Sequence, residues 1–224
     1  MDVQVKRLNN PFVFATLLNK ADLKRGVFIT GTDTDVGKTW VGCHLIKHLI
    51  RQGVDVAPRK PVESGWSDDI RQTDAWKLAD AANKQEQLEL ICPNRFIAPI
   101  SPARAARLEN KALPLEQLKQ QCFEQLQDHQ LLYVEGAGGF LSPLCEDALN
   151  ADLCVALGLP VILIAEDKLG CINHVLLSVE AILQRGLTLL GIVLNTKKTS
   201  NNTLKQNNLE DLREYLDCVI ISTG

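Results

Sequence analysis

The sequence predicts an α/β fold with three layers, in which helices cover both faces of a doubly wound, mostly parallel sheet. Two observations lead to this prediction. Short, continuously apolar runs alternate along the chain with longer segments of helical periodicity, and strands that are apolar throughout are typical of parallel sheets buried on both faces. The length of 224 residues suits one large domain with a core on each side of the sheet.

The apolar runs are expected to form the strands. Most are rich in Val, Ile and Leu, which favour extended backbone, and most end at a polar residue or a glycine. In order along the chain they cover residues 27–30, 54–59, 131–135, 161–165, 188–195 and 218–221. Ligands of such sheets bind at the carboxyl ends of the strands. Functional residues are therefore expected where these runs end.

The segments between these runs carry helical signals. The clearest of them has apolar residues spaced three and four apart and is stopped by Gly53. Pro114 stands near the start of another helix, and Asn173 and Gly186 fit the first and last caps of a third. The expected helices cover residues 39–52, 74–82, 114–127, 150–157, 173–185 and 209–216.

The composition excludes several classes of protein. Apolar residues make up 46% of the chain and charged residues 23%, as in ordinary globular domains. The net charge of −3 offers no basic surface for a nucleic acid or a membrane, so a small-molecule partner is expected. The longest apolar run, 153–165, is too short to span a bilayer. The 7 cysteines lack metal-ligand spacing and indicate reduced thiols in a cytoplasmic protein.

The chain divides into a short first region and one domain. Residues 1–25 are expected to form an N-terminal extension, and residues 26–224 a single α/β domain. Two basic residues in the extension precede a short apolar stretch, but no small-residue cleavage signature follows them. Within the domain, residues 63–73 and 197–207 are polar and are expected to be loops.

A glycine-rich loop follows the first predicted strand directly. It reads Gly-Thr-Asp-Thr-Asp-Val-Gly-Lys-Thr over residues 31–39, and the first predicted helix begins at its end. Glycines let backbone N–H groups face phosphate oxygens, and the start of the helix adds its dipole. In such a loop Lys38 would reach the β- and γ-phosphates of ATP, and the Thr39 hydroxyl would ligate Mg²⁺. Gly31 stands one residue before the usual position of the first glycine. The loop still predicts an ATP-binding, phosphate-loop NTPase-like domain.

Two acidic residues are candidates for the metal site. Glu135 ends an apolar strand and is followed by Gly136-Ala137-Gly138-Gly139, which leaves room for a ligand near the backbone. Carboxylates at such positions commonly complete a nucleotide-bound Mg²⁺ site. A strand-end glutamate that only meets solvent is the alternative. For Asp74, a favourable charge at the start of a helix explains the residue equally well.

Lys60 is a candidate for a second cation at the phosphates. It follows the strand predicted at 54–59, so it would lie at the carboxyl edge near the phosphate loop. Together with Lys38 it would form a clamp on developing negative charge, while an ordinary surface lysine is the alternative. His44 and His48 lie four residues apart on one predicted helix, but without a third ligand they are expected to be solvated.

These motifs together resemble the dethiobiotin synthetase family. The matching segments follow the family's order and are GTDTDVGKT at 31–39, KPVESG at 60–65, the region of Asp74, SP at 101–102, VEGAGG at 134–139, PVILI at 160–164, KLGCINH at 168–174 and Asn195. VEGAGG and KLGCINH are more specific than the phosphate loop, which many ATPases share. The resemblance covers about Gly26 to Asn195.

The resemblance implies an ATP-dependent reaction of diaminononanoate with CO₂. The carbamate of the diamine takes the γ-phosphoryl group of ATP, and the second amine attacks the resulting carbamic-phosphoric anhydride to close a cyclic urea. The products are dethiobiotin, ADP and phosphate, in biotin biosynthesis. Mg²⁺ is the implied cofactor and ATP a co-substrate. A homodimer with the substrate site at its interface is also implied, with no nucleic acid and no membrane as partners.

The resemblance also assigns roles by matching motif positions. It implies that Lys60, Lys38 and Thr34 are catalytic, and that Thr39, Asp74 and Glu135 hold Mg²⁺. The nucleotide-binding residues that it implies are Asp35, Val36, Gly37, Lys38, Thr39, Trp40, Asp74, Glu135, Gly136, Ala137, Gly138, Asn195 and Thr196. The substrate residues that it implies are Ser64, Pro102, Gly138, Leu169, Gly170, Cys171, Ile172 and Asn173. Of these, 170–173 would come from the second subunit, where a helix start suits a carboxylate.

The chain departs from the family pattern in three places. Asp35 stands where the family more often has Glu, so a water-mediated metal contact there is expected to change. The first 25 residues precede a strand with which the family usually begins. The family also continues beyond the last predicted strand with a loop that helps to hold the nucleotide base, so a weaker hold on the base is expected.

Two other functions fit the phosphate loop. A partition-type switch ATPase would share the sheet but typically carries a second lysine near the start of the loop, where this chain has Thr32 and Asp33. It would also be expected to carry an amphipathic basic segment for a membrane. A degenerate relative that binds nucleotide without catalysis is the other alternative.

Overall fold

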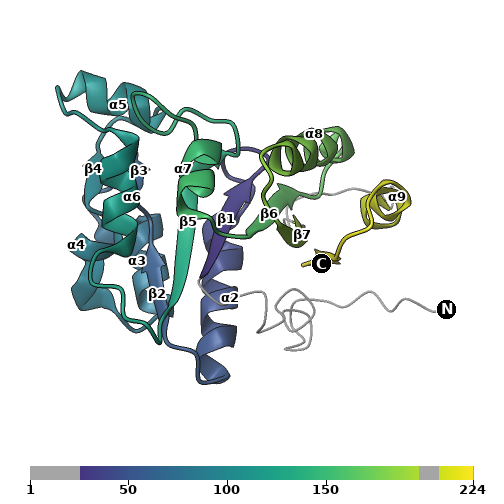
Figure 1. Cartoon of the computed structure of the whole chain (residues 1–224), viewed down its shortest axis with the longest axis horizontal. Coiled ribbons are helices and arrows are strands. Elements are labelled where there is room, and N and C mark those ends of the chain that lie inside the picture. Colours follow the sequence, from purple (N-terminus) through teal and green to yellow (C-terminus); the bar gives the residue numbers. More distant parts are fainter. Residues whose placement is uncertain (1–25, 197–206, 224) are drawn as a thin grey trace.

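A computed structural model describes residues 26–196 and 207–223. The extension expected at 1–25 and nearly all of the loop expected at 197–207 lie outside the described residues. The main sheet has 6 strands in the order β2-β5-β1-β6-β7-β8, all paired in parallel (Figure 1). These strands are β1 (Gly26–Gly31), β2 (Val56–Arg59), β5 (Leu131–Gly139), β6 (Val161–Glu166), β7 (Leu189–Asn195) and β8 (Ile220–Ser222). The predicted mostly parallel sheet is therefore confirmed.

Helices cover both faces of this sheet. They are α2 (Lys38–Arg51), α3 (Asp74–Ala81), α4 (Leu88–Ile91), α5 (Pro102–Leu108), α6 (Leu115–Phe123), α7 (Asn150–Leu157), α8 (Cys171–Gln184) and α9 (Asn208–Tyr215). A second, two-stranded sheet joins β3 (Val62–Ser64) to β4 (Asn94–Phe96). Figure 1 shows α7 and α2 on opposite faces of the main sheet, which is the predicted three-layer arrangement.

Successive side chains of β1 alternate between two buried cores, one on each face of the main sheet. Val27 and Ile29 pack with α2 in one buried cluster, whereas Phe28 packs with α7 and α8 in the other. Both sets are fully buried, because successive side chains of a strand point to opposite faces. A strand covered on both sides must be apolar throughout, and this is the pattern that predicted the parallel sheet.

The parallel register places the end of β5 beside the end of β1. Ile29 of β1 pairs with Glu135 of β5, and Gly31 pairs with Gly139 after a register shift. The N–H of Phe140 donates to the Gly31 carbonyl over 3.0 Å. The end of β5 therefore runs directly beside the phosphate loop at the carboxyl edge of the sheet.

The structure corrects several predicted boundaries. The helix predicted from an Asn173 cap begins at Cys171, because Gly170 adopts the left-handed backbone (φ 87°) that ends the preceding turn. The strand predicted to end at Glu135 continues to Gly139, where it pairs with Gly31. The helix predicted to reach residue 127 ends at Phe123. The short elements β3, α4, β4 and α5 were not predicted.

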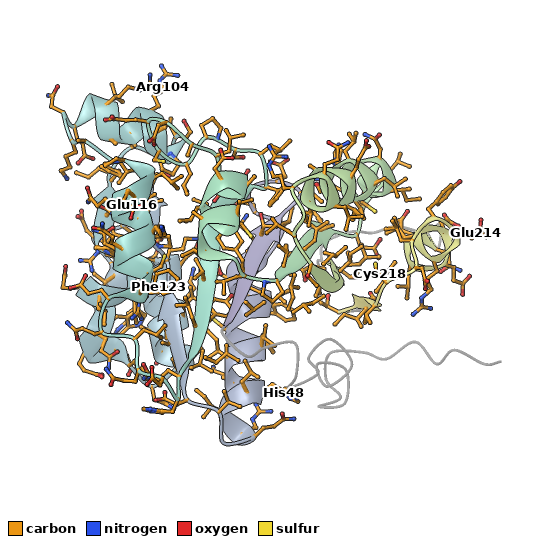
Figure 2. The ribbon with its side chains drawn as sticks, in the orientation of Figure 1. His48, Arg104, Glu116, Phe123, Glu214 and Cys218 are labelled. Atoms are coloured by element: carbon orange, nitrogen blue, oxygen red, sulfur yellow. The ribbon has the colours of Figure 1, made fainter. Side chains whose placement is uncertain are left out.

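His48 corrects a second expectation. It is buried at the far end of α2, away from the phosphate loop (Figure 2). His44 is exposed, and its Nδ1 lies 2.8 Å from the Trp40 carbonyl oxygen. The prediction of a solvated histidine is therefore wrong for His48, whose Nε2 lies 3.1 Å from the Gln52 amide nitrogen. None of the 7 cysteines, all within the described ranges, forms a disulfide, as predicted. Among the described residues, no helix has the length and apolar content needed to cross a bilayer.

Candidate active site

The phosphate loop links β1 to α2 and depends on left-handed backbone at two positions. Gly37 has φ 95° and Asp35 has φ 54°. A Cβ added at Gly37 would lie 2.0 Å from the amide nitrogen of Asn195, so only glycine fits there. At Gly31, an added Cβ would meet the Asp33 carbonyl oxygen at 2.8 Å. Although Gly31 stands one residue early in the motif, the loop packs so closely against it that a side chain would not fit.

Lys38 lies inside this loop without a carboxylate partner among the described residues. Its Nζ donates to the Asp33 carbonyl over 2.9 Å, and the residue is only 7% exposed. Burial, together with the nearby charge of Lys60, lowers the pKa of Lys38 to about 8. A buried ammonium that is held only by a carbonyl suits an incoming phosphate, which would supply the missing negative charge.

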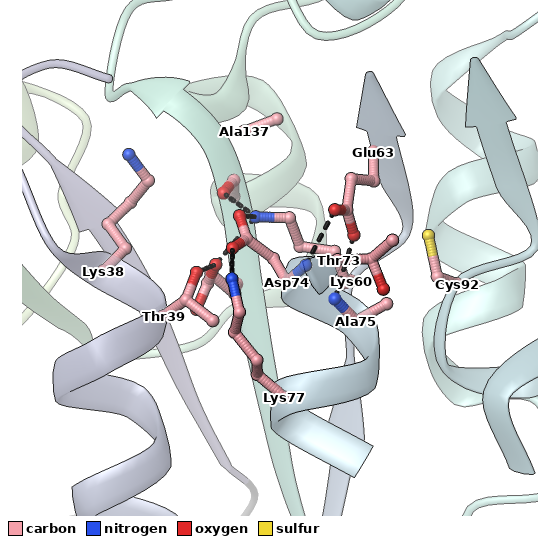
Figure 3. Close-up of polar contacts among 12 residues, drawn as sticks. Lys38, Thr39, Lys60, Glu63, Thr73, Asp74, Ala75, Lys77, Cys92 and Ala137 are labelled. Carbon is pink, nitrogen blue, oxygen red and sulfur yellow. Dashed lines mark hydrogen bonds and ion pairs between the residues drawn. The ribbon is translucent and has the colours of Figure 1, made fainter. Parts of the chain in front are cut away.

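Lys60 forms the centre of a buried charged cluster (Figure 3). Its Nζ lies 2.7 Å from Glu135 Oε1 and 3.3 Å from Asp74 Oδ2. The Thr39 hydroxyl donates to the same Glu135 Oε1 over 2.7 Å. Four elements therefore meet here: the end of β2, the strand β5, and the first residues of α2 and α3. The predicted proximity of these residues at the carboxyl edge is confirmed.

The charges in this cluster shift the pKa values of Lys60 and Asp74. Burial disfavours the charge of Lys60, but Glu135 and then Asp74 outweigh it and hold the pKa of Lys60 above its usual range. Burial likewise works against the Asp74 carboxylate, yet Lys60 and the Thr39 hydroxyl lower its pKa. Lys60 is therefore charged, buried and fixed in place, which excludes the surface-lysine alternative.

The oxygen atoms of this cluster fit a magnesium ion. Thr39 offers a hydroxyl, and Asp74 and Glu135 offer carboxylates, which are the hard oxygen ligands that Mg²⁺ takes beside phosphates and water. The cluster already attracts a cation, since Lys60 bridges both carboxylates. A cavity of about 370 Å³ adjoins it and is lined by Asp35, Gly37, Lys38, Thr39, Trp40, Cys43, Asp74 and Lys77.

Glu63 supports Asp74 and was not predicted. Its carboxylate accepts hydrogen bonds from the N–H groups of Asp74 and Ala75, over 2.8 and 2.9 Å. It thereby caps the start of α3, which Thr73 also caps through its hydroxyl. Burial raises the pKa of Glu63, against the opposing effect of Lys60. Because Glu63 comes from β3, far from the helix in sequence, no local cap pattern signals its role.

Asn150 holds the backbone at the end of β5, beyond Glu135. This fully buried residue accepts from the Ala137 N–H over 3.0 Å and donates to the carbonyls of Ala137, Gly139 and Ser142 at 2.6, 3.2 and 3.3 Å. A Cβ added at Gly136 would lie 2.6 Å from its Oδ1. Gly136, one of the glycines predicted to leave room for a ligand, therefore leaves room for Asn150.

The predicted catalytic and substrate residues fall into separate places. Thr34 is exposed and faces Gly138, where an added Cβ would lie 3.7 Å from the Thr34 methyl group. Ser64 ends β3, and Pro102 begins α5 as a buried first residue. In contrast, Leu169, Gly170, Ile172 and Asn173 line a cavity of about 820 Å³ that includes residues of α9. Within the described residues, no hydrogen bond or ion pair joins that segment to the Lys60 cluster.

Asn195 and Thr196 lie at the end of β7. The Asn195 amide donates to the Val36 carbonyl over 2.9 Å and accepts from the Thr223 hydroxyl at 3.2 Å. The Thr196 N–H also donates to Thr223, over 2.8 Å. Asn195 therefore ties the phosphate loop to the last strand. A contact of Asn195 or Thr196 with adenine stays a prediction.

Comparison with known proteins gives consistent matches. The family model described as AAA domain matches residues 25–222. ATP-dependent dethiobiotin synthetase BioD of Anaeromyxobacter dehalogenans is 46% identical over 171 residues, which are 76% of each chain. The proteins of the same name from Caulobacter vibrioides and Methanocaldococcus jannaschii are 41% and 38% identical, over 76% and 75% of this chain and 80% and 78% of theirs.

A solved structure is more distant. The kinase domain of Escherichia coli tyrosine kinase ETK has a TM-score of 0.48 and 19% identity, over 84% of this chain and 73% of that one, a likeness too remote to inform function. The family match rests on the sequence relatives and on the family model, both of which span most of the chain. The chain therefore belongs to the dethiobiotin synthetase family within the phosphate-loop NTPases, and it is an enzyme of the ligase class.

Proposed function

We propose that the chain carboxylates diaminononanoate with CO₂ and closes the ring to dethiobiotin in biotin biosynthesis, at the expense of ATP. One observation supports this most. The buried Lys60 ammonium stands 2.7 Å from Glu135 and 3.4 Å from the Gly136 carbonyl, beside the phosphate loop. A second fixed cation at this place suits an anionic phosphoryl acceptor such as a carbamate, because it stabilises charge where the transfer occurs.

The proposed reaction has three steps: carbamate formation, phosphoryl transfer and ring closure. One amine of the substrate adds to CO₂ and loses a proton, which gives a carbamate. A carbamate oxygen then takes the γ-phosphoryl group as ADP leaves, forming a carbamic-phosphoric anhydride. The second amine attacks the carbonyl carbon, and phosphate leaves as the ring closes. In this scheme Lys38 holds the transferring phosphoryl group and Lys60 the carbamate, with Thr34 nearby, and Ser64, Pro102 and the 136–139 backbone line the substrate.

The metal would be held by three residues. Thr39, Asp74 and Glu135 offer oxygen ligands that converge within the cluster around Lys60. When bound, Mg²⁺ would neutralise charge between the phosphates of ATP. Asp35, Val36, Gly37, Trp40 and Thr196 are the further residues proposed to contact the nucleotide, with Asn195 directed to adenine.

We also propose a homodimer. Leu169 is 84% exposed, and Leu177 and Leu183 on α8 are more than half exposed, which supports an apolar face that a second copy would cover. The segment Leu169–Asn173 lines its own cavity, apart from the Lys60 cluster, as expected if it serves the partner's site. Its helix start would meet the substrate carboxylate. A cytoplasmic location stays a prediction.

A direct assay tests the proposal. The purified chain is incubated with Mg-ATP, bicarbonate and diaminononanoate, and phosphate and dethiobiotin are both followed. We expect phosphate release that depends on the diamine and matches dethiobiotin one for one. Phosphate release without the diamine would overturn the proposal in favour of a switch ATPase. Nucleotide binding with no turnover would favour a degenerate relative instead.

Lys60→Ala separates catalysis from nucleotide binding. We expect turnover to fall by about 100-fold or more, as when a charge-stabilising donor is lost, while ATP affinity changes little. Lys38→Ala serves as the comparison and should weaken both, because Lys38 lies inside the phosphate loop. Steady-state kinetics and calorimetric titration with ATP measure the two effects. Unchanged turnover in Lys60→Ala would contradict its assigned role.

A further inference from the structure

Tyr133 lies next to the charged cluster but belongs to none of the motifs above. It precedes Glu135 by two residues on β5, so both side chains point to the same face of the sheet. Both residues are fully buried. The Tyr133 hydroxyl donates to Glu135 Oε2 over 3.3 Å. Among the described residues, Tyr133 is the one donor to this oxygen, since Thr39 and Lys60 both bind Oε1.

We propose that Tyr133 is a positioning residue for the metal site. By holding Oε2, its hydroxyl keeps the Glu135 carboxylate turned so that Oε1 faces Thr39 and Lys60. A buried carboxylate with one oxygen unpaired would be costly and free to rotate. Partners of ligating carboxylates tune metal affinity in this way, because they fix the ligand before the metal arrives. The inference rests on the proposed role of Glu135 as a ligand.

The helix opposite is built around this hydroxyl. A Cβ added at Gly42 of α2 would lie 2.0 Å from the Tyr133 hydroxyl oxygen and 3.3 Å from Glu135 Oε2. Glycine weakens a helix interior relative to alanine. Its presence at position 42 is explained if the hydroxyl must reach Glu135, since any larger residue would occupy the same space. Two elements thus converge on one hydrogen bond to the carboxylate.

Tyr133→Phe tests the inference, because it removes one oxygen and leaves the ring in place. Mn²⁺ serves as the probe, and its binding to the protein–ADP complex is measured by electron paramagnetic resonance. We expect Mn²⁺ to bind about tenfold more weakly, at the lower end of what loss of such a partner costs. The affinity for ADP without metal should stay close to that of the unchanged chain, whereas the unfolding temperature without metal should fall by about 2–4 °C, because Glu135 Oε2 loses its donor.

Thr30→Val is the matched control. Thr30 lies on the adjacent β1, is fully buried, and its hydroxyl has no hydrogen-bond partner among the described residues. Removing this hydroxyl should leave Mn²⁺ affinity unchanged. An Mn²⁺ affinity in Tyr133→Phe equal to that of the unchanged chain would overturn the inference. An equal loss of Mn²⁺ affinity and of metal-free ADP affinity would do the same, because it would indicate general damage to the site.

Glu135→Gln separates this inference from the proposed function. If Glu135→Gln weakens Mn²⁺ binding and Tyr133→Phe does not, Glu135 is a ligand and the positioning role of Tyr133 is wrong. If neither variant weakens Mn²⁺ binding, the assignment of Glu135 as a ligand fails first, and the inference fails with it. The activity assay with diaminononanoate is not needed for either outcome.

Discussion

Single residues without a predicted role hold the charged cluster in place. Asp74 begins α3, and its position depends on Glu63, whose carboxylate binds the first two N–H groups of that helix. A buried cap of this kind both stabilises the helix and aims its first side chain. The ion pair of Asp74 with Lys60 at 3.3 Å therefore depends on Glu63. The Glu63 carboxylate binds backbone N–H groups and neither of the two charged side chains.

Glu63→Ala should destabilise the chain by about 1–2 kcal/mol, because two N–H groups at a buried helix start lose their acceptor. Denaturant unfolding measures the change. Glu89→Ala is the control, since Glu89 pairs with Arg95 while its own side chain is 84% exposed, and it should cost less than about 0.5 kcal/mol. Equal effects of the two substitutions would contradict the capping role.

Gly42→Ala should be destabilising although alanine favours helices by about 1 kcal/mol over glycine. The added Cβ would lie 2.0 Å from the Tyr133 hydroxyl, and the core around it has no room to yield. Combining it with Tyr133→Phe should recover about 1 kcal/mol or more, since neighbouring residues in contact couple by such amounts. A double-mutant cycle of unfolding free energies measures this, and strictly additive effects would disprove the contact.

A site residue can be predicted from the sequence when its position in the sequence signals its role, but not when its role depends on contacts with other elements. Lys38 and Thr39 begin the helix after the phosphate loop, Lys60 follows β2, and Glu135 stands where an apolar run meets glycines. Parallel strands bring such positions together at one edge, so their convergence could be predicted. Glu63 and Asn150 act on backbone groups that are distant in sequence, and Tyr133 looks like any core residue of an apolar strand. Their roles appear only when the elements are packed.

At the level of elements, the long helices were predictable from their periodicity, and the six strands of the main sheet from their continuous apolar runs. The region from β3 to α5 was not, because β3, α4 and β4 are three or four residues long and too short to show a period. Only α5 carried a usable signal, the Pro102 that follows Ser101 at its first position.

The start of α7 holds the end of β5 and the turn that follows it. Asn150, its first residue, donates to the carbonyls of Ala137, Gly139 and Ser142. Asn150→Asp would place an acceptor against these carbonyls, so we expect the KM for diaminononanoate to rise about tenfold or more. ATP affinity should fall less, although the resemblance also implies that Gly136, Ala137 and Gly138 contact the nucleotide. Asp152→Asn on the same helix is the control, because asparagine can still accept from the Leu149 N–H. A shift confined to ATP affinity would contradict the assignment of this turn to the substrate.

At the level of the whole molecule, one chain holds two separated parts of the proposed site. Lys60 and the phosphate loop lie at the carboxyl edge near β1 and β5, whereas the segment Leu169–Asn173 lines a cavity with α9. If the homodimer forms as proposed, each site combines the Lys60 cluster of one protomer with the α8 start of its partner. Such a shared site can be tested by mixing two inactive variants.

Lys60→Ala supplies one inactive partner and Asn173→Glu the other, since a carboxylate at the α8 start would repel the substrate carboxylate without harming the helix. Random mixing makes half of the dimers mixed, and one of the two sites in each mixed dimer is intact, so activity should return to about 25% of the unchanged chain. Each variant alone should stay inactive. Different affinity tags on the two variants, followed by co-purification, confirm that mixed dimers form. Mixed dimers without recovered activity would indicate that each site is complete within a single protomer, because then every site in the mixture carries one of the two substitutions.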